Sequence, residues 1–409
     1  MTPAFFPVAL SAALFSLFAS GCSTLSSLPP QPVEVPALEG DLSGNIFEFQ
    51  NRLIQDEETG SNVALVFKDG EKIYHQVVNS GKAGDRDIEE NTLFPIWSMS
   101  KPITIVAMMT LHEKGLFDWD DPVSKYMPCF EKLMVREGET VRPAKEPLRV
   151  KHLMTHRSGY TYYLFGTPHE YGSPHPNQTR FHDLQDYVEV AAKTPVNFEP
   201  GTDYVYGINQ AILGRLVEVL GGQSFSDYLQ ETIFKPLGMT ETSFVLDEER
   251  RSRFQPLFIN SGSLKGFTYM LDELNYNPAS HAHFGGEGLL STLGDYSRFC
   301  EMLLNGGEFR GQRIISEDSI ATMTQASTKD FDELNVPGFD MGFSLFVMSD
   351  PARDGTRTPK GIFGWAGYHN THFWIDPETN LYALFMSRAR EFNFDIPRQL
   401  RVAIYGKLD

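Results

Sequence analysis

Cysteine is scarce in this chain of 409 residues, which contains only Cys22, Cys129 and Cys300. No Cys-x-x-Cys pair and no His-Glu-x-x-His motif occurs, and the isolated pair His281 and His283 indicates a metal site only weakly. Two lone cysteines are more typical of small buried hydrophobic residues than of a disulfide, so the pairing of Cys129 with Cys300 stays open.

Runs of Lys and Arg are also absent, and the net charge is -18 with a pI near 5.1. Nucleic acids and polyphosphates bind surfaces with basic patches, because such patches displace their counterions. We therefore expect no nucleic-acid partner. The acidic balance is typical of a soluble, solvated surface.

Charged side chains are missing from residues 1–21, which form an apolar segment too short to span a membrane comfortably. The segment ends in small residues before Cys22, an arrangement that resembles a bacterial lipoprotein signal, in which the Cys is lipidated after cleavage. The first residues lack the usual Lys or Arg, so a secreted protein and a misassigned start codon remain as alternatives. We predict a signal peptide at 1–21 and a Ser/Pro-rich tether at 22–40. Residues 41–409 would then be a catalytic domain of the bacterial envelope, facing the periplasm and anchored to the membrane through lipid on Cys22.

Strand patterns occur at both ends of this domain, with helical patterns between them. Residues 63–67 and 73–78 flank Asp69-Gly70, a dipeptide favoured in tight hairpins, and 371–375 and 381–387 flank a second turn. Helices are predicted at 103–114, 184–192, 210–220, 226–232, 294–304 and 395–405. This order predicts an α+β fold: an antiparallel sheet from N- and C-terminal segments, flanked by helices, with an inserted, mainly helical lobe.

Ser98 and Lys101 are the first candidates for chemistry. Positions i and i+3 share a helix face, so their side chains can touch if a helix begins near Ser98. Pro102 fits only in a first turn, and the following residues are largely apolar. Ser98 would thus lie at the positive end of a buried helix, where an anionic intermediate is stabilised. Because a Ser-x-x-Lys match can arise by chance, the motif alone is weak.

Two further elements follow along the chain. Tyr206 lies between a turn and an apolar helix, where its hydroxyl can share a proton with a nearby Lys, although a packed core Tyr is the commoner outcome. Residues 363–368 contain Gly364 and Gly367, which allow a substrate to approach the backbone of a strand. A structural bulge would explain the same glycines.

In this order, the three elements resemble the motifs of the serine β-lactamase and penicillin-binding-protein-like superfamily, with class C β-lactamases and family VIII carboxylesterases as the most similar branches. The resemblance extends from about Leu42 to the C-terminus. It implies Ser98 as the nucleophile and Lys101 with Tyr206 as the proton-transfer pair. It also implies an oxyanion hole formed by the backbone N–H groups of Ser98 and Tyr368, and it requires neither a metal nor an organic cofactor.

Two departures from the family motifs point away from lactam substrates. Trp365 stands where lactamases and peptidases have a Lys, and Ile208 stands where they have an Asn. Asn209 could replace the missing Asn if the motif is aligned one residue later. Trp365 and Gly367 would border the substrate. Losing a charge-assisted contact and an amide contact weakens binding by about 1–3 kcal/mol each.

These residues predict a serine hydrolase that acts through an acyl-enzyme on Ser98, with carboxylester hydrolysis as the first interpretation. A β-lactamase or D-Ala-D-Ala carboxypeptidase is the alternative, and a non-catalytic envelope binding protein is an alternative of another class. The aromatic segment 160–181 would add an apolar wall for an acyl or alcohol group if it borders the cleft. The oligomeric state and the natural ester are not encoded in any motif.

Overall fold

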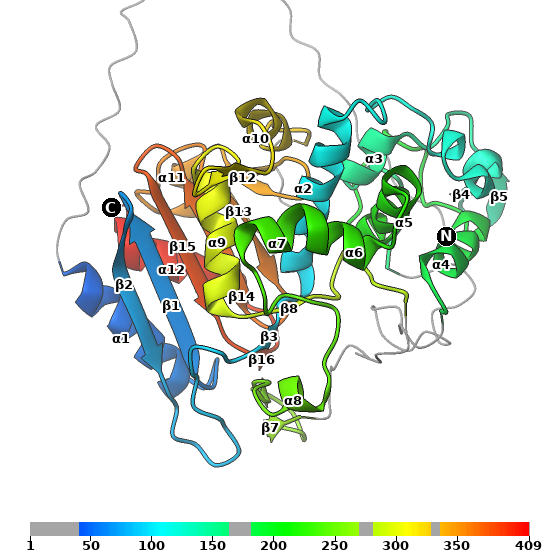
Figure 1. Ribbon diagram of the computed structural model, residues 1–409. Coiled ribbons are helices and arrows are strands. Elements are labelled where there is room, and N and C mark those ends of the chain that lie inside the picture. Colours follow the sequence, from blue (N-terminus) through cyan, green and yellow to red (C-terminus); the bar gives the residue numbers. More distant parts are fainter. Residues whose placement is uncertain (1–40, 163–180, 270–280, 329–335, 409) are drawn as a thin grey trace, which may run out of the picture. The chain divides into compact units, whose positions relative to one another are not determined.

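The computed structural model in Figure 1 describes residues 41–162, 181–269, 281–328 and 336–408. The predicted signal peptide 1–21, Cys22 and the tether 22–40 lie outside the described residues, as does most of the aromatic segment 160–181. The described residues all belong to the catalytic domain predicted from residue 41 onward.

A seven-stranded antiparallel sheet joins the two ends of this domain, as the strand patterns predict. Its strand order is β11-β12-β13-β14-β15-β1-β2, and Leu65 of β1 pairs with Leu384 of β15. Asp69 and Gly70, which connect β1 to β2, both have positive φ, at 50° and 86°. The strands are β11 (Phe339–Met341), β12 (Phe346–Met348), β13 (Phe363–Gly367), β14 (Thr371–Asp376), β15 (Leu381–Met386), β1 (Asn62–Lys68) and β2 (Glu71–Val78).

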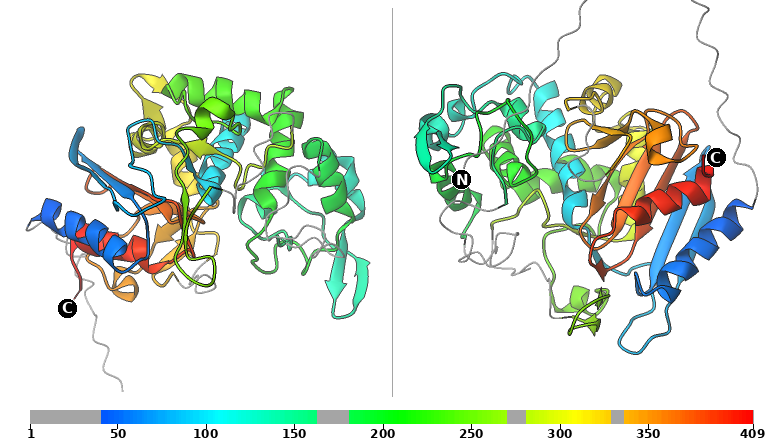
Figure 2. Two further views of the ribbon diagram at one scale, coloured as in Figure 1. Left: turned by 90° about the horizontal axis from the view of Figure 1, so that it is seen from below. Right: turned by 180° about the vertical axis from the view of Figure 1, so that it is seen from behind.

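Helices cover both faces of the sheet, which explains why every residue of β14 and β15 is buried. Helix α9 (Leu293–Leu304) lies on one face, and α1 (Leu42–Gln55) and α12 (Asp395–Tyr405) lie together on the other (Figures 1 and 2). Helix α1 was not predicted from the sequence. It is capped by Asp41, and it buries Ile46, Phe49 and Leu53 against the sheet.

A mainly helical lobe stands beside the sheet, as predicted, with α2 (Ser100–Glu113) running between the two (Figure 1). Helix α2 is buried from Ser100 to Leu111, because apolar residues occur on all of its sides. The predicted helix at 226–232 differs in form: α6 ends at Leu229, and a π-helical turn continues to Phe234. The lobe and its surroundings contain α3 (Val150–Met154), α4 (Leu184–Lys193), α5 (Asn209–Gly221), α6 (Phe225–Leu229), α7 (Lys235–Leu237), α8 (Glu248–Arg251), α10 (Glu317–Met323) and α11 (Pro351–Asp354).

Short strand pairs complete the described structure: β3 (Phe94–Pro95) with β8 (Leu290–Ser291), β4 (Met134–Glu137) with β5 (Thr140–Pro143), β9 (Glu308–Phe309) with β10 (Gln312–Arg313), and β6 (Leu257–Ile259) with β7 (Gly266–Thr268) and β16 (Ala389–Arg390). Cys129 and Cys300 are both free thiols, so they do not pair. Among the described residues, no helix combines the length and the apolar character that crossing a membrane requires.

Candidate active site

Ser98 lies in a one-turn 3-10 helix (Trp97–Met99) that leads directly into α2, so the α-helix itself begins two residues later than Ser98. Trp97 has a φ of +46°, a strained conformation for a bulky side chain. Its buried indole N–H donates a 2.8 Å hydrogen bond to Nδ1 of His369, which helps to hold this conformation. Strained residues of this kind gather at functional sites, where the surrounding structure fixes them.

Lys101 reaches Ser98 from the first turn of α2, as the i, i+3 spacing predicts. Its side chain is fully buried, with an exposed fraction of 0 %. The Nζ atom donates hydrogen bonds to Ser98 Oγ at 3.0 Å, to the Tyr162 hydroxyl at 2.8 Å and to the carbonyl of Gly286 at 2.7 Å. No carboxylate pairs with this amine in the described part of the chain, so its partners are a nucleophile, a phenol and a backbone oxygen.

Tyr206 approaches the same serine from the loop before α5. Its hydroxyl donates a 2.8 Å hydrogen bond to Ser98 Oγ, and its ring lies 4.7 Å from Lys101 Nζ. The next residue, Gly207, makes this approach possible, because a Cβ there would lie 2.1 Å from the carbonyl oxygen of Tyr160. Of the three residues that the sequence predicts as the catalytic group, Lys101 and Tyr206 therefore both lie within hydrogen-bond distance of Ser98.

Tyr162 is a member of this group that sequence reasoning missed. Besides its contact with Lys101, its ring packs edge-on against Tyr206 with centroids 5.5 Å apart. Burial, followed by the neighbouring charges of Tyr206 and Glu287, raises the pKa of Tyr162 well above its usual value. The aromatic segment was a visible signal, but no spacing distinguished Tyr162 from its aromatic neighbours.

Strand β13 forms the opposite wall. Its pairing with β12 stops at Gly364, so Trp365, Ala366 and Gly367 form ladder pairs with β14 on one side only. Gly367 lies against the turn that carries Ser98, since a Cβ there would be 2.3 Å from the carbonyl oxygen of Ile96. Tyr368 follows, and its ring packs edge-on against Trp97 with centroids 5.4 Å apart. Residues 367 and 368 therefore pack against the turn that carries Ser98, and the oxyanion hole of the Ser98 and Tyr368 N–H groups stays a prediction.

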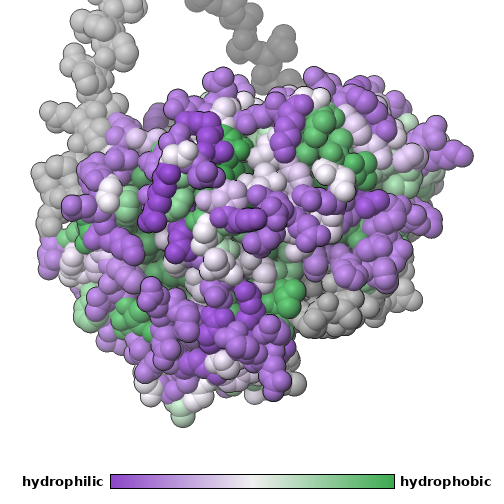
Figure 3. Space-filling view, in the orientation of Figure 1, coloured by the Kyte–Doolittle hydropathy of each residue, from purple (hydrophilic) through white to green (hydrophobic). Residues whose placement is uncertain are grey.

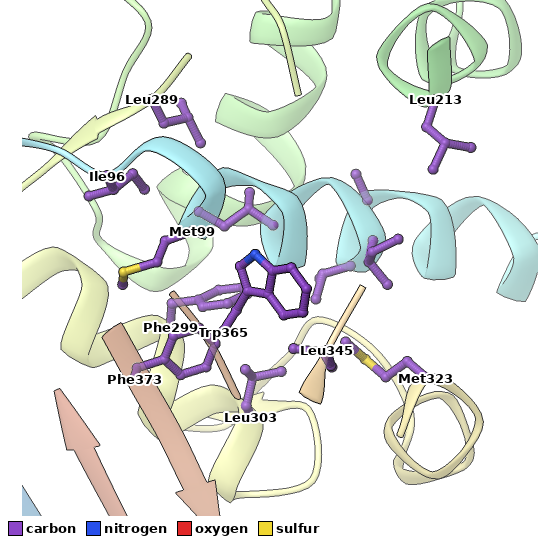
Figure 4. Packing of buried hydrophobic residues seen from close by; sticks show 14 of the residues in the cluster. Ile96, Met99, Leu213, Leu289, Phe299, Leu303, Met323, Leu345, Trp365 and Phe373 are labelled. Carbon is purple, nitrogen blue, oxygen red and sulfur yellow. The ribbon is translucent and has the colours of Figure 1, made fainter. Parts of the chain in front are cut away.

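Trp365 belongs mainly to the hydrophobic core. Only 4 % of its surface is exposed, and Figure 4 shows its indole below α2, near Phe299 and Phe373. Its ring stacks on Phe346 at a centroid distance of 4.2 Å. Thus a neutral ring, packed between the sheet and α2, occupies the place at which the family motif has a Lys.

Asn209 does not face the cleft. It is fully buried, and its side chain bonds to Ser158 Oγ at 2.5 Å and to His156 Nδ1 at 2.8 Å. Burial, assisted by the charge of Lys101, lowers the pKa of His156 well below its usual value. These bonds hold the His156 loop against α5, so the suggested substitution of Asn209 for the missing amide contact finds no support in its geometry.

A cavity of about 130 Å³ opens in front of Ser98. None of the described residues that line it carries a charge, and most of them are aromatic. The lining consists of Ser98, Tyr162, Tyr206, Phe346, Trp365, Ala366, Gly367, Tyr368, Phe392 and Phe394. A nucleophile at one end of an apolar pocket can accept an uncharged carbonyl compound whose apolar part fills the pocket.

Known proteins resemble this chain in sequence and in fold. Esterase EstB of Burkholderia gladioli is 24 % identical over 405 residues, which cover 94 % of this chain and 100 % of EstB. A putative D-alanyl-D-alanine carboxypeptidase of Escherichia coli K12 is 22 % identical and covers 96 % of this chain, with 95 % of its own length matched. Among solved structures, EstCE1, a hydrolase with promiscuous acyltransferase activity, superposes with a TM-score of 0.77 at 20 % identity, covering 89 % of this chain and 98 % of EstCE1.

A sequence model of one family covers nearly the whole described domain. The model, described as Beta-lactamase, matches residues 50–405, from the first helix of the domain to its last. The match agrees with the sheet topology, with the structural neighbour and with the order of the three motifs. The chain therefore belongs to the Beta-lactamase family.

Proposed function

We propose that this protein is a serine carboxylesterase that forms an acyl-enzyme on Ser98. The observation that carries the proposal is the contact of Ser98 Oγ with both Lys101 Nζ and the Tyr206 hydroxyl, at the end of an uncharged aromatic cavity. The similarity to EstB supports an ester as the substrate. A retained nucleophile with two proton-transfer partners also argues against a purely binding role.

In the first half-reaction Ser98 Oγ attacks the ester carbonyl and forms a tetrahedral oxyanion. The Ser98 proton passes to the Lys101 amine, which lies within hydrogen-bond distance, while the Tyr206 hydroxyl donates a hydrogen bond to Ser98 Oγ. We assign the oxyanion to the backbone N–H groups of Ser98 and Tyr368, which are fixed in place before the reaction. When the intermediate collapses, the bond to the alkoxide breaks, and the same proton converts the leaving group to an alcohol.

In the second half-reaction water attacks the acyl-Ser98 carbonyl. Its proton passes to the Lys101 and Tyr206 pair and then returns to Ser98 as the carboxylic acid leaves. Positioned acid–base help of this kind contributes about 10²–10⁴-fold to the rate. Because the described lining of the cavity is apolar, an acyl group without charge fits it better than one that carries a carboxylate.

Replacement of Ser98 by Ala tests the proposal. The wild-type protein should hydrolyse short p-nitrophenyl esters and react with a fluorophosphonate probe, whereas Ser98→Ala should lose both activities by at least about 10³-fold. Intact mass spectrometry should find one phosphonyl adduct, located on Ser98. Ester hydrolysis that persists in Ser98→Ala would contradict the assignment of the nucleophile.

A second candidate function is D-Ala-D-Ala peptidase or β-lactamase activity, which the similarity to the putative carboxypeptidase of Escherichia coli favours. The neutral Trp365 and the apolar lining oppose it, since these substrates carry a carboxylate. Rapid acylation by a fluorescent penicillin together with release of D-alanine would support this function over the esterase.

We further propose that the protein is an envelope lipoprotein anchored through Cys22. The proposal is supported by the apolar segment 1–21 and the small residues before Cys22. Metabolic labelling with a palmitate analogue in the native host should label the wild-type protein and not Cys22→Ala. A wild-type protein without label, recovered from the medium, would favour secretion instead.

A further inference from the structure

A second cavity, of about 640 Å³, shares none of its lining residues with the cavity in front of Ser98. It opens between α3, α10 and the segment that follows α2, which lie near one another in Figure 1. The backbone N–H of Lys151 in α3 bonds to the carbonyl of Trp119 after α2, and Ser319 of α10 bonds to Glu113 at the end of α2. The volume lies within the roughly 300–1,000 Å³ of pockets that hold small organic molecules.

The floor of this cavity contains a cation that no carboxylate neutralises. Terminal nitrogens of Arg157 donate to the carbonyl of Gly201 at 2.6 Å and to that of Ser327 at 3.3 Å. In the part of the chain that the structure describes, the Arg157 guanidinium forms no ion pair, and its buried Nε has no hydrogen-bond partner. A guanidinium has five N–H donors, so these two carbonyls leave donors and a full positive charge available to an anion.

His152 adds a neutral donor beside this cation. Its Nδ1 accepts a hydrogen bond from the backbone N–H of Arg149 at 3.2 Å, so the proton of the neutral ring lies on Nε2. Nε2 faces Gly201, which also lines the cavity, since a Cβ there would lie 2.9 Å from it. Burial, followed by the charges of Lys151, Arg149 and Arg157, lowers the pKa of His152 to about 4.

Aromatic rings form a second wall of the same cavity. Trp119 and Phe343 both line it, and their rings pack edge-on with centroids 5.3 Å apart. The other neighbour of Trp119 is His112, which stacks on the indole at 3.9 Å and fixes its orientation. The cavity therefore combines positive charge on one side with a rigid apolar surface on another.

We propose that this cavity binds a small organic acid whose carboxylate pairs with Arg157 and Lys151. The apolar body of the acid then packs against Trp119 and Phe343. A carboxylate suits the planar guanidinium, because its two oxygens can accept two parallel N–H bonds. Lys151 is already paired with Asp120, so Arg157 makes the larger contribution. Binding at this place is independent of the proposed esterase activity.

Isothermal titration calorimetry with benzoate tests the proposal, and benzamide is the uncharged molecule of the same shape. Benzoate should bind the wild-type protein saturably, and benzamide should bind at least about 10-fold more weakly, since a hydrogen bond to a charged group is lost. Arg157→Gln removes the charge and keeps a polar side chain, so benzoate affinity should fall by at least about 10-fold. Lys151→Gln should lower it severalfold.

Two control variants should leave the affinity for benzoate within about twofold of the wild-type value. Lys235→Gln removes one positive charge from α7, where the side chain is 70 % exposed. Phe392→Ala alters the cavity in front of Ser98 instead.

No saturable binding of benzoate to the wild-type protein would overturn the proposal. So would an unchanged affinity in folded Arg157→Gln, or in Lys151→Gln if only that variant folds. A loss of affinity confined to Phe392→Ala would place benzoate in the catalytic cavity and would also overturn it.

Discussion

At the scale of single residues, the site depends on a backbone that is held in an unfavourable conformation. Trp97 has positive φ immediately before Ser98, and its indole is fixed by His369. Such strain costs about 1–3 kcal/mol, and it persists because the buried surroundings of Trp97 determine its position. The nucleophile is therefore presented to the cavity in one orientation before any substrate arrives.

Glycine at position 207 supports a residue-scale prediction. Gly207→Ala would place a methyl group 2.1 Å from the carbonyl oxygen of Tyr160, so the Tyr206 loop must move away from Ser98. A displacement of about 1 Å at a catalytic group lowers rates about 100-fold, and we expect kcat/KM for p-nitrophenyl butyrate to fall to that extent.

The control for this change is Gly294→Ala in α9, where the new methyl group would meet only one atom, at 3.9 Å. Its kcat/KM should stay within about twofold of the wild-type value. A Gly207→Ala enzyme of normal stability and full activity would show that the close approach of Tyr206 to Ser98 is not needed.

Sequence reasoning was sufficient for Ser98, Lys101 and Tyr206 and insufficient for their neighbours. The first two share a helix turn, so their spacing alone brings them together. Tyr162 reaches the cluster from a loop whose path depends on tertiary packing, and no local pattern predicts such a path. For Asn209 the sequence showed the side chain but not its hydrogen-bond partners, Ser158 and His156.

At the scale of elements, β13 and the segment before α12 form the two apolar sides of the cavity. The rings of Phe392 and Phe394 pack edge to face with centroids 4.6 Å apart, and both border the pocket. The cavity of about 130 Å³ is smaller than the roughly 300–1,000 Å³ typical of pockets for drug-sized ligands. We therefore expect short acyl chains to be preferred.

Phe392→Ala should widen this pocket and change the preference. The ratio of kcat/KM for p-nitrophenyl octanoate to that for the butyrate should rise by about 10-fold, since each added methylene can now be buried. Phe47→Ala on α1 is the matched control, because that ring is 47 % exposed and lies on a different element. An unchanged ratio in Phe392→Ala would mean that the acyl chain binds elsewhere.

Element prediction from the sequence succeeded where periodicity and turn signals coincide. The hairpin at Asp69-Gly70 and the C-terminal helix α12 agree with their patterns within one or two residues. Helix α1 was overlooked because its apolar positions, such as Ile46 and Phe49, follow a Pro-rich segment that reads as a tether. Helix α1 is the first element in the described part of the chain, and the boundary at residue 41 stays a prediction.

At the scale of the whole molecule, charge governs the encounter with substrate. The net charge is -18, and the face shown in Figure 3 is largely hydrophilic, with small hydrophobic areas between polar side chains. Large exposed hydrophobic side chains, such as Phe47, Val141 and Leu264, belong to separate elements. A field of this sign repels anionic substrates over distances comparable to the Debye length.

Salt should therefore affect charged and neutral esters differently. For a p-nitrophenyl monoester of succinic acid, kcat/KM should rise severalfold between 10 mM and 500 mM NaCl, whereas for p-nitrophenyl acetate it should change little. Parallel salt responses of the two esters would show that the overall charge does not influence the approach to Ser98.

The pairing of β1 with β15 has a consequence for how the chain folds. Leu65 and Leu384 are partners in adjacent strands although most of the sequence separates them, so the contact order of the sheet is high. Strand β1, which lies between β15 and β2, keeps one edge unpaired until β15 has been synthesised. Closing so long a loop is entropically costly and makes folding slow. The helical lobe, by contrast, is formed by residues that lie in the sequence between the two halves of the sheet. Insertions there can alter the walls of the cavity without disturbing the pairing of β1 with β15.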